Sequence, residues 1–178
     1  LGAARRNASY LAAIDQGTSS SRVILYDVDT LKPVASHQVE LQSATTTPQA
    51  GWSQMDPMAI VSTVEKSAAG ALDKVGAKAS DVIGVGITNQ RESTVVWDKN
   101  TGEPLYDAVL WHDARTRETS ETLKKELGGQ DALRSVCGLP ISTYFSGIKL
   151  RWLAGESRQP VRALASPTQP CPFHPRAW

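Results

Sequence analysis

The sequence predicts an α/β domain in which helices flank a mixed five-stranded sheet. Three apolar stretches joined by short polar links open the chain, and a helical pattern follows them. A continuous apolar run and a second helical pattern come next. This order is typical of a mixed sheet that is covered by helices. We expect the domain at 10–156, between an N-terminal extension (1–9) and a proline-rich tail (157–178).

The opening strands are predicted at 10–14, 22–27 and 33–41. The links between them are only a few residues long, so we expect antiparallel hairpins. A polar loop is predicted over 42–54, because a threonine-proline stretch and Gly51 argue against regular structure.

The dipeptide Asp56-Pro57 predicts the start of a helix, with Asp as the N-cap and Pro in the first turn. Apolar residues then recur at helical spacing up to Val75, and Gly76 is a natural end. The run 82–88 is apolar nearly throughout. We therefore expect a strand that is buried on both faces.

Gly84 and Gly86 lie on the same side of that expected strand, which would admit a helix or a ligand closely. The pattern beyond it predicts more strands and helices. The strands are expected at 94–98 and 108–111, and the helices at 114–127, 131–137 and 147–154, with Ser146 as the cap of the last.

The C-terminal segment has a different composition. Five of the ten prolines lie between Pro160 and Trp178, and this segment shows no periodicity. Such a sequence cannot continue a helix or a central strand, so we expect a disordered tail. A segment that binds a polyproline-recognising partner is the alternative.

The composition excludes several classes of function. A net charge of +1 gives no electrostatic basis for binding nucleic acid or an anionic membrane. No apolar run approaches the roughly 18 residues that a membrane span requires. The two cysteines form no metal-binding pair. They also do not suggest a disulfide scaffold, which favours a reducing compartment. The chain starts at Leu1, so a targeting segment upstream stays open.

The segment Asp15-Gln-Gly-Thr-Ser-Ser-Ser-Arg22 joins the first two expected strands and suits a nucleotide phosphate. Asp15 is a hard oxygen ligand for hydrated Mg²⁺. Gly17 permits positive φ and close approach of the backbone. The hydroxyl groups can donate to phosphate oxygens, and Arg22 can neutralise charge. An ordinary polar turn is the alternative.

A second set of polar residues, Asn89-Gln-Arg-Glu92, follows the apolar run 82–88. Ligand sites in such sheets form at the carboxyl ends of strands. A small polyol needs donors and acceptors together, which Arg91 and Glu92 supply. Trp111 can give an apolar wall, and Tyr144 can add a hydroxyl.

Each of these residues also has a structural alternative. Arg91 and Glu92 could form a surface ion pair, and the two aromatic side chains could belong to the core. Arg115 and Arg117 are most simply explained as the solvated start of a helix.

Five blocks of residues occur in this order along the chain: Asp15-Gln-Gly-Thr-Ser-Ser-Ser-Arg22, Gly51-Trp-Ser-Gln-Met-Asp-Pro57, Gly86-Ile-Thr-Asn-Gln-Arg-Glu92, Val96-Trp-Asp-Lys-Asn-Thr-Gly102 and Tyr144-Phe-Ser-Gly-Ile-Lys149. With these blocks, the chain from about Tyr10 to Ala154 resembles the glycerol kinases, sugar kinases with the actin-like ATPase fold. The order of strands and helices also resembles the ribonuclease-H-like half of that superfamily. Within the family, the Asn-Gln-Arg-Glu block separates glycerol kinases from relatives that act on pentuloses or gluconate.

The resemblance implies ATP-dependent phosphorylation of glycerol to sn-glycerol 3-phosphate, with Mg²⁺. Positions that match glycerol-binding residues are Arg91, Glu92 and Tyr144, with Trp111 against the carbons. Positions that match residues around the nucleotide phosphates are Thr18, Ser19, Ser20 and Arg22, with Asp15 near the metal.

The resemblance ends at about Glu156, before the family's Gly-Asp-Gln block, whose Asp is the general base, and before its second domain. It therefore implies an N-terminal fragment of a phosphotransferase that is inactive alone. A related kinase of another polyol or a ketose, or a non-catalytic binding domain, stays open. We expect glycerol and ATP as ligands, and a cytoplasmic location with mitochondrial association as the alternative. Homo-oligomerisation of the full-length enzyme stays open.

Overall fold

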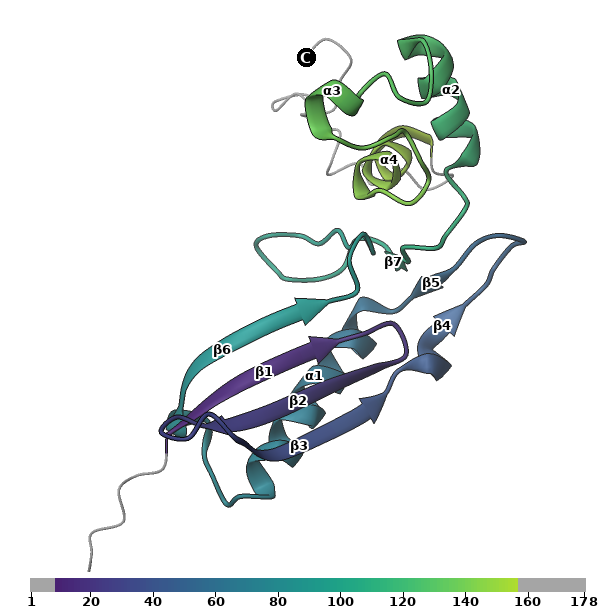
Figure 1. The fold of residues 1–178 in the computed structure, drawn as a ribbon. Helices are drawn as coiled ribbons and strands as arrows, with labels where there is room; N and C mark the ends of the chain where they lie inside the picture. The colour runs from purple at the N-terminus through teal and green to yellow at the C-terminus, as the bar shows by residue number, and fades with distance from the viewer. Residues whose placement is uncertain (1–8, 157–178) are drawn as a thin grey trace, which may run out of the picture. The chain divides into compact units, whose positions relative to one another are not determined.

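The computed structural model describes residues 9–156, which form two compact units (Figure 1). The first unit takes the described residues up to 45 together with 56–90. The second takes 46–55 together with the described residues from 91 onward. The expected tail (157–178), and the expected extension except for Ser9, lie outside the described residues.

The first unit contains a four-stranded sheet in the order β3-β2-β1-β6. Three antiparallel strands are adjacent in the chain, as predicted: β1 (Tyr10–Gln16), β2 (Ser20–Asp27) and β3 (Pro33–Glu40). The fourth strand, β6 (Val82–Asn89), pairs in parallel with β1. A short 3-10 turn, Ala79–Asp81, leads into it.

One helix, α1 (Pro57–Asp73), packs against this sheet. It begins as predicted, because the Asp56 carboxylate accepts a hydrogen bond from the Met58 N–H. Gly76, with φ of +61°, follows its end. The core beneath the helix consists of Tyr10, Val23, Leu25 and Ala71 with partly buried neighbours.

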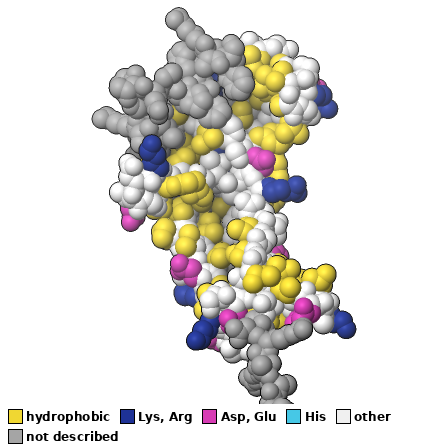
Figure 2. Space-filling view, turned by 90° about the vertical axis from the view of Figure 1, so that its left-hand side faces the viewer, with side chains coloured by type: hydrophobic (Ala, Val, Ile, Leu, Met, Phe, Trp, Pro, Cys, Tyr) yellow, Lys and Arg dark blue, Asp and Glu magenta, His cyan; other side chains and the backbone are white. Residues whose placement is uncertain are grey.

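The expectation that the strand over 82–88 is buried on both faces was wrong. Ile83, Val85 and Ile87 are 63%, 57% and 72% exposed. The reason is position, because β6 is the edge of the described sheet and α1 contacts mainly β2 and β3. Hydrophobic side chains also reach the surface on the face drawn in Figure 2. The space beside Gly84 is taken by the Leu11 side chain, 3.0 Å from an added Cβ.

The second unit holds a small antiparallel pairing of β5 (Gln54–Met55) with β7 (Ala108–Val109). The strand expected at 94–98 is reduced to isolated bridges, from Thr94 to Val109 and from Trp97 to Pro104. A tight turn at Gly102, with φ of +78°, separates the second pair. The described residues therefore form a four-stranded sheet and a second small one, rather than one five-stranded sheet.

Two short elements lie where the chain leaves the first unit, the 3-10 turn Gln42–Ala44 and β4 (Thr45–Thr46). The helices of the second unit are α2 (Arg117–Leu127), α3 (Arg134–Cys137) and α4 (Ser146–Arg151), which continues as a π-helical turn over Trp152–Glu156. Left-handed glycines end α2 and α3, at Gly128 and Gly138.

The core of the second unit consists of Val96, Val109, Trp152 and Leu153. Within residues 9–156, no helix combines the length and the apolar character that crossing a bilayer requires.

Candidate functional site

The hairpin tip, Asp15–Arg22, joins β1 to β2 as the sequence predicts. The Gly17 N–H donates to the Ser20 carbonyl at 2.9 Å, and the Leu41 N–H donates to the Ser19 carbonyl at 2.7 Å. Gly17 permits a positive φ but does not use it, since it is not among the described residues with positive φ. An added Cβ would lie 3.3 Å from the Ser20 carbonyl oxygen, a tight contact that favours glycine at this position.

Asp15 and Arg22 are cross-strand neighbours, so their side chains lie on the same face of the hairpin. Both are exposed. The Arg22 guanidinium donates to Gln38 Oε1, with Nε at 2.8 Å, and Gln38 donates to Glu40 Oε1 at 2.9 Å. The predicted metal ligand and the predicted phosphate cation therefore share one solvent-facing surface.

The predicted hydroxyl donors occupy the turn between these two residues. Ser19 is exposed, and Thr18 and Ser20 are half-buried. The strand pairing and the turn hydrogen bond at Gly17 fix the backbone that carries them. Such a turn presents hydroxyl and backbone donors to an anion at one place.

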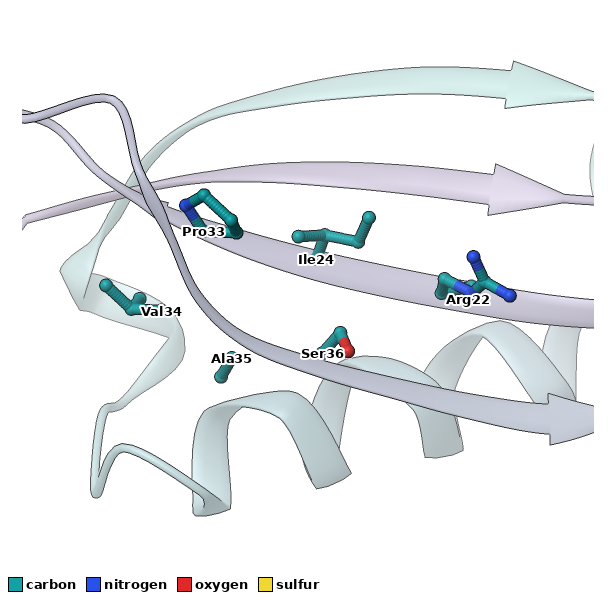
Figure 3. A pocket seen from close by; sticks show the side chains of 6 residues that line it. All are labelled: Arg22, Ile24, Pro33, Val34, Ala35 and Ser36. Atoms are coloured by element: carbon teal, nitrogen blue, oxygen red, sulfur yellow. The ribbon is translucent and has the colours of Figure 1, made fainter.

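A shallow hollow lies beside Arg22 on β2 and β3 (Figure 3). Its lining consists of Arg22, Ile24, Pro33, Val34, Ala35 and Ser36. Apolar residues alternate here with polar backbone and side-chain atoms, and Arg22 is the one lining residue that belongs to the predicted phosphate set. The hollow therefore adds no further phosphate ligand to the hairpin tip.

Gln16 was not predicted as a site residue. Its side chain is buried, and its Nε2 donates to the Gly17 carbonyl at 2.7 Å. Gln90 Nε2 donates to Gln16 Oε1 at 3.2 Å. These bonds connect the end of β1 to the end of β6. In the sequence, the only sign of a role for the two glutamines is that both lie inside blocks that match the glycerol kinases.

In the second unit, Glu92 adopts a left-handed backbone with φ of 66°. This conformation costs a non-glycine residue about 1 kcal/mol and therefore needs support from its surroundings. Glu92 Oε2 accepts hydrogen bonds from the Ser146 N–H at 2.8 Å and from Ser146 Oγ at 2.9 Å. The predicted cap of the last helix was wrong, because Phe145 is the N-cap and the Ser146 hydroxyl donates to Glu92 instead.

Trp111 and Tyr144 lie beside each other, with ring centroids 6.2 Å apart and planes at 71°. Trp111 is 39% exposed, and Tyr144 is half-buried. The backbone N–H of Trp111 donates at 3.1 Å to Oγ of Ser93, the residue after Glu92. Glu92, Trp111, Tyr144 and Ser146 together are called the Glu92 cluster below.

Two structural alternatives for these residues do not hold. The exposed Trp111 indole does not belong to the core. The ion pairs of the described residues do not include Arg91 with Glu92. Arg91 itself is exposed, and only its place in the chain brings it close to Glu92.

Arg115 was predicted to be solvated, and that prediction was wrong. Its Nη2 lies 2.8 Å from Asp113 Oδ2, and both side chains are fully buried. The guanidinium carbon lies 4.1 Å from the ring centroid of Trp52 and 5.2 Å from that of Trp152. The ion pair and the aromatic rings explain why this charge can leave water. Arg117, by contrast, is exposed, as expected.

Lys149 was also missed, although it lies in a matching block. Its side chain is fully buried, and Nζ donates to the Tyr144 carbonyl at 2.5 Å. Burial lowers the pKa of Lys149 to about 8, against the opposing effect of the Glu92 and Asp113 charges. The sequence signal for its burial is its place between Ile148 and Trp152, which share one face of the expected helix.

The candidate metal site is the single carboxylate of Asp15 at the hairpin tip, not a cluster of several protein ligands. No group of three His, Cys, Asp or Glu residues within 9–156 could hold an ion. Hydrated Mg²⁺ on a nucleotide takes only one or two protein carboxylates, with water and phosphate supplying the rest. The single exposed Asp15 fits that requirement.

Comparison with known proteins gives a family match. The pattern of the FGGY family of carbohydrate kinases, N-terminal domain, matches residues 10–167. The chain is 51% identical over 149 residues to a glycerol kinase of Arabidopsis thaliana, covering 81% of this chain and 28% of that protein. It is 49% identical over 144 residues to a glycerol kinase of Brucella anthropi, with the same two shares.

Solved structures agree on the fold. A Plasmodium falciparum glycerol kinase with ADP has a TM-score of 0.75 at 27% identity, covering 88% of this chain and 30% of that one. A xylulose kinase from Lactobacillus acidophilus has a TM-score of 0.74 at 21% identity, covering 86% and 30%, and supports the fold alone. The chain thus spans less than a third of the proteins that it matches.

Proposed function

Because the chain belongs to the FGGY family of carbohydrate kinases, we propose that it is the N-terminal part of a glycerol kinase. The reaction transfers the γ-phosphoryl group of ATP to a primary hydroxyl of glycerol and yields sn-glycerol 3-phosphate and ADP. The 51% and 49% identities to glycerol kinases support this substrate over other polyols.

The observation that carries the proposal is the geometry of the Glu92 cluster. One carboxylate oxygen of Glu92 is held by Ser146, and the other oxygen would accept a hydrogen bond from a ligand hydroxyl. The Trp111 and Tyr144 rings lie beside it and give a three-carbon chain an apolar wall. Arg91 supplies rigid donors next in the chain, and the Tyr144 hydroxyl supplies another polar contact.

The hairpin tip supplies the phosphate side of the proposed reaction. Thr18, Ser19 and Ser20 would donate to phosphate oxygens, and Arg22 would neutralise their charge. Asp15 would hold Mg²⁺ through its water shell, and the ion supplies charge neutralisation on the transferring phosphoryl group. Catalysis of this kind is mainly positioning and electrostatics.

The proposed reaction also needs groups from the parts of a glycerol kinase that this chain does not match. The chain spans 28% of the Arabidopsis relative. We place the general base that accepts the glycerol proton, and the contacts to adenine, in the remainder of such a protein. The 178-residue chain would then bind ligands without turnover.

The test compares two proteins in an ADP-release assay. The 178-residue chain should release no ADP above background with glycerol and ATP. A chimera in which residues 10–156 replace the matching segment of the Arabidopsis glycerol kinase should phosphorylate glycerol in preference to xylulose.

Arg91→Ala in that chimera should lower kcat/KM for glycerol at least tenfold, because a charge-assisted contact is lost. Preference for xylulose would contradict the proposed substrate. Turnover by the 178-residue chain would contradict the proposal that the general base and the adenine contacts lie in the rest of such a protein.

A further inference from the structure

Lys149 is a charged group that the proposed reaction does not use, yet it contacts Tyr144, a member of the Glu92 cluster. It is fully buried in the first turn of α4, between Ile148 and Leu150. Its Nζ donates to the Tyr144 carbonyl at 2.5 Å and lies 6.0 Å from the centroid of the Tyr144 ring. An ammonium group without water is costly, so this burial requires compensation from nearby groups.

Two carboxylates compensate the charge, those of Glu92 and Asp113. Asp113 is already neutralised, because Arg115 pairs with it and the Ser53 N–H donates to it at 2.5 Å. Glu92 has no such ion pair among the described residues, and its bonds come from the neutral Ser146. Glu92 is therefore the negative charge that remains to balance Lys149.

The local chain geometry makes this balance relevant to the ligand site. Tyr144, Ser146 and Lys149 lie within six residues of one another at the start of α4. Lys149 holds the carbonyl of Tyr144 while Ser146 holds the carboxylate of Glu92. The same short segment thus fixes the backbone of Tyr144 and the carboxylate of Glu92.

We propose that Lys149 is a positioning residue of the polyol site. Its buried ammonium fixes the backbone at Tyr144, and its charge attracts the Glu92 carboxylate and holds it in place. Loss of the ammonium leaves the Tyr144 carbonyl without this donor and Glu92 without its opposite charge. The ligand in this inference rests on the proposed function, whereas the coupling of Lys149 to Glu92 and Tyr144 does not.

The first experiment measures the coupling in the 178-residue chain without any ligand. The Lys149 Cε resonance is titrated by ¹³C NMR in the native chain and in Glu92→Gln. We expect the pKa of Lys149 to be lower in Glu92→Gln, because the Glu92 charge raises it in the native chain. An unchanged titration in the folded variant would show that the two groups are not coupled and would overturn the proposal.

The second experiment uses Lys149→Met, with Lys125→Met on the exposed face of α2 as the matched control. The amide resonances of Phe145 and Ser146 should shift in Lys149→Met and stay in place in Lys125→Met. If Lys149→Met does not fold, Lys149→Gln replaces it, because the amide NH₂ group can still donate a hydrogen bond but carries no charge. A folded variant with unmoved resonances contradicts the positioning role.

The third experiment is calorimetric titration of the same chains with glycerol. Lys149→Met should weaken glycerol binding about tenfold, and Lys149→Gln should recover part of this loss. Native affinity should also fall as the pH rises through about 8, where Lys149 loses its charge, while Lys149→Met shows no such fall. Equal glycerol affinity of the native chain and Lys149→Met would overturn the proposal. If the native chain binds no glycerol but the first experiment shows Lys149 coupled to Glu92, only the proposed substrate is contradicted.

Discussion

The hairpin tip and the Glu92 cluster present polar side chains in different ways. At the hairpin tip, Asp15 and Arg22 are exposed, strand pairing fixes their backbone, and the exposed Gln38 is the hydrogen-bond partner of the Arg22 side chain. In the Glu92 cluster, Ser146 binds the carboxylate directly, and buried charges lie beneath it.

This difference follows from the ligands proposed for each. A phosphate carries its own charge and several acceptors, so exposed donors on a short turn suffice to bind it. A neutral polyol offers only hydroxyl groups, so each protein group must already point in the right direction. We therefore expect mutations beneath the Glu92 cluster to have larger effects than mutations around the hairpin.

The largest effect should come from Arg115→Leu. This change leaves the buried Asp113 carboxylate without its partner, which costs about 3–5 kcal/mol of unfolding free energy. Urea unfolding followed by circular dichroism measures the loss, and Arg117→Leu on the exposed side serves as the control. Equal losses in the two variants would contradict this stabilising role of the buried Arg115–Asp113 ion pair.

A second large effect should appear as a pH dependence of stability. The unfolded Lys149 keeps its proton up to its ordinary pKa of 10.5, whereas the folded one releases it near pH 8. The unfolded state therefore binds more protons between these values, and the free energy of unfolding rises with pH by up to about 3 kcal/mol. Below pH 8 the cost of burying the charge is fully present. The rise should be missing in Lys149→Met, and urea titrations at pH 7 to 10.5 measure it.

A smaller effect is expected in the first unit from Gly70→Ala. An added Cβ would lie 2.6 Å from the His37 ring, at the contact between β3 and α1. Overpacking of this kind costs about 1–3 kcal/mol, and the better helix propensity of Ala offsets about 1 kcal/mol of that. Gly86→Ala is the control, because nothing lies within 4 Å of its Cβ. Recovery in Gly70→Ala/His37→Ala would identify the ring as the cause.

The smallest effect should be at the turn between β2 and β3. The Thr30 hydroxyl and N–H both donate to Asp27 Oδ1, and they hold the pKa of this carboxyl below 3.8. Thr30→Val should move that pKa toward 3.8, as NMR titration would show. The native turn keeps its added stability above pH 3.8 and loses it as the pH falls through the lower folded pKa. An unchanged titration would show that the backbone bond alone is responsible.

The sequence predicted the first unit better than the second for a physical reason. The hairpin strands and α1 follow from local patterns, such as the Asp56-Pro57 start and the alternation of β2. Burial of β6 was wrong because it depends on what covers the strand, and a local apolar run carries no such information.

The Glu92 cluster shows the same limit at the level of the site. Residue types and the family resemblance predicted Glu92, Trp111 and Tyr144, and the structure brings these three together. Arg115 and Lys149 were not predicted, because a basic residue near a helix start is usually solvated. Their polar partners are local, since Asp113 lies two residues before Arg115 and the Tyr144 carbonyl five residues before Lys149. The Trp52 ring over Arg115 comes from a distant segment, which a local pattern does not reveal.

The distribution of tryptophan between the two units makes them optically separable. The described tryptophans, at positions 52, 97, 111 and 152, all belong to the second unit. Trp52 and Trp152 meet edge to face at 5.4 Å, whereas Trp111 is partly open to solvent. Intrinsic fluorescence excited at the indole band therefore reports on the second unit, and a soluble quencher acts first on the open indoles. A polyol that covers Trp111 would shield that emission without any attached label.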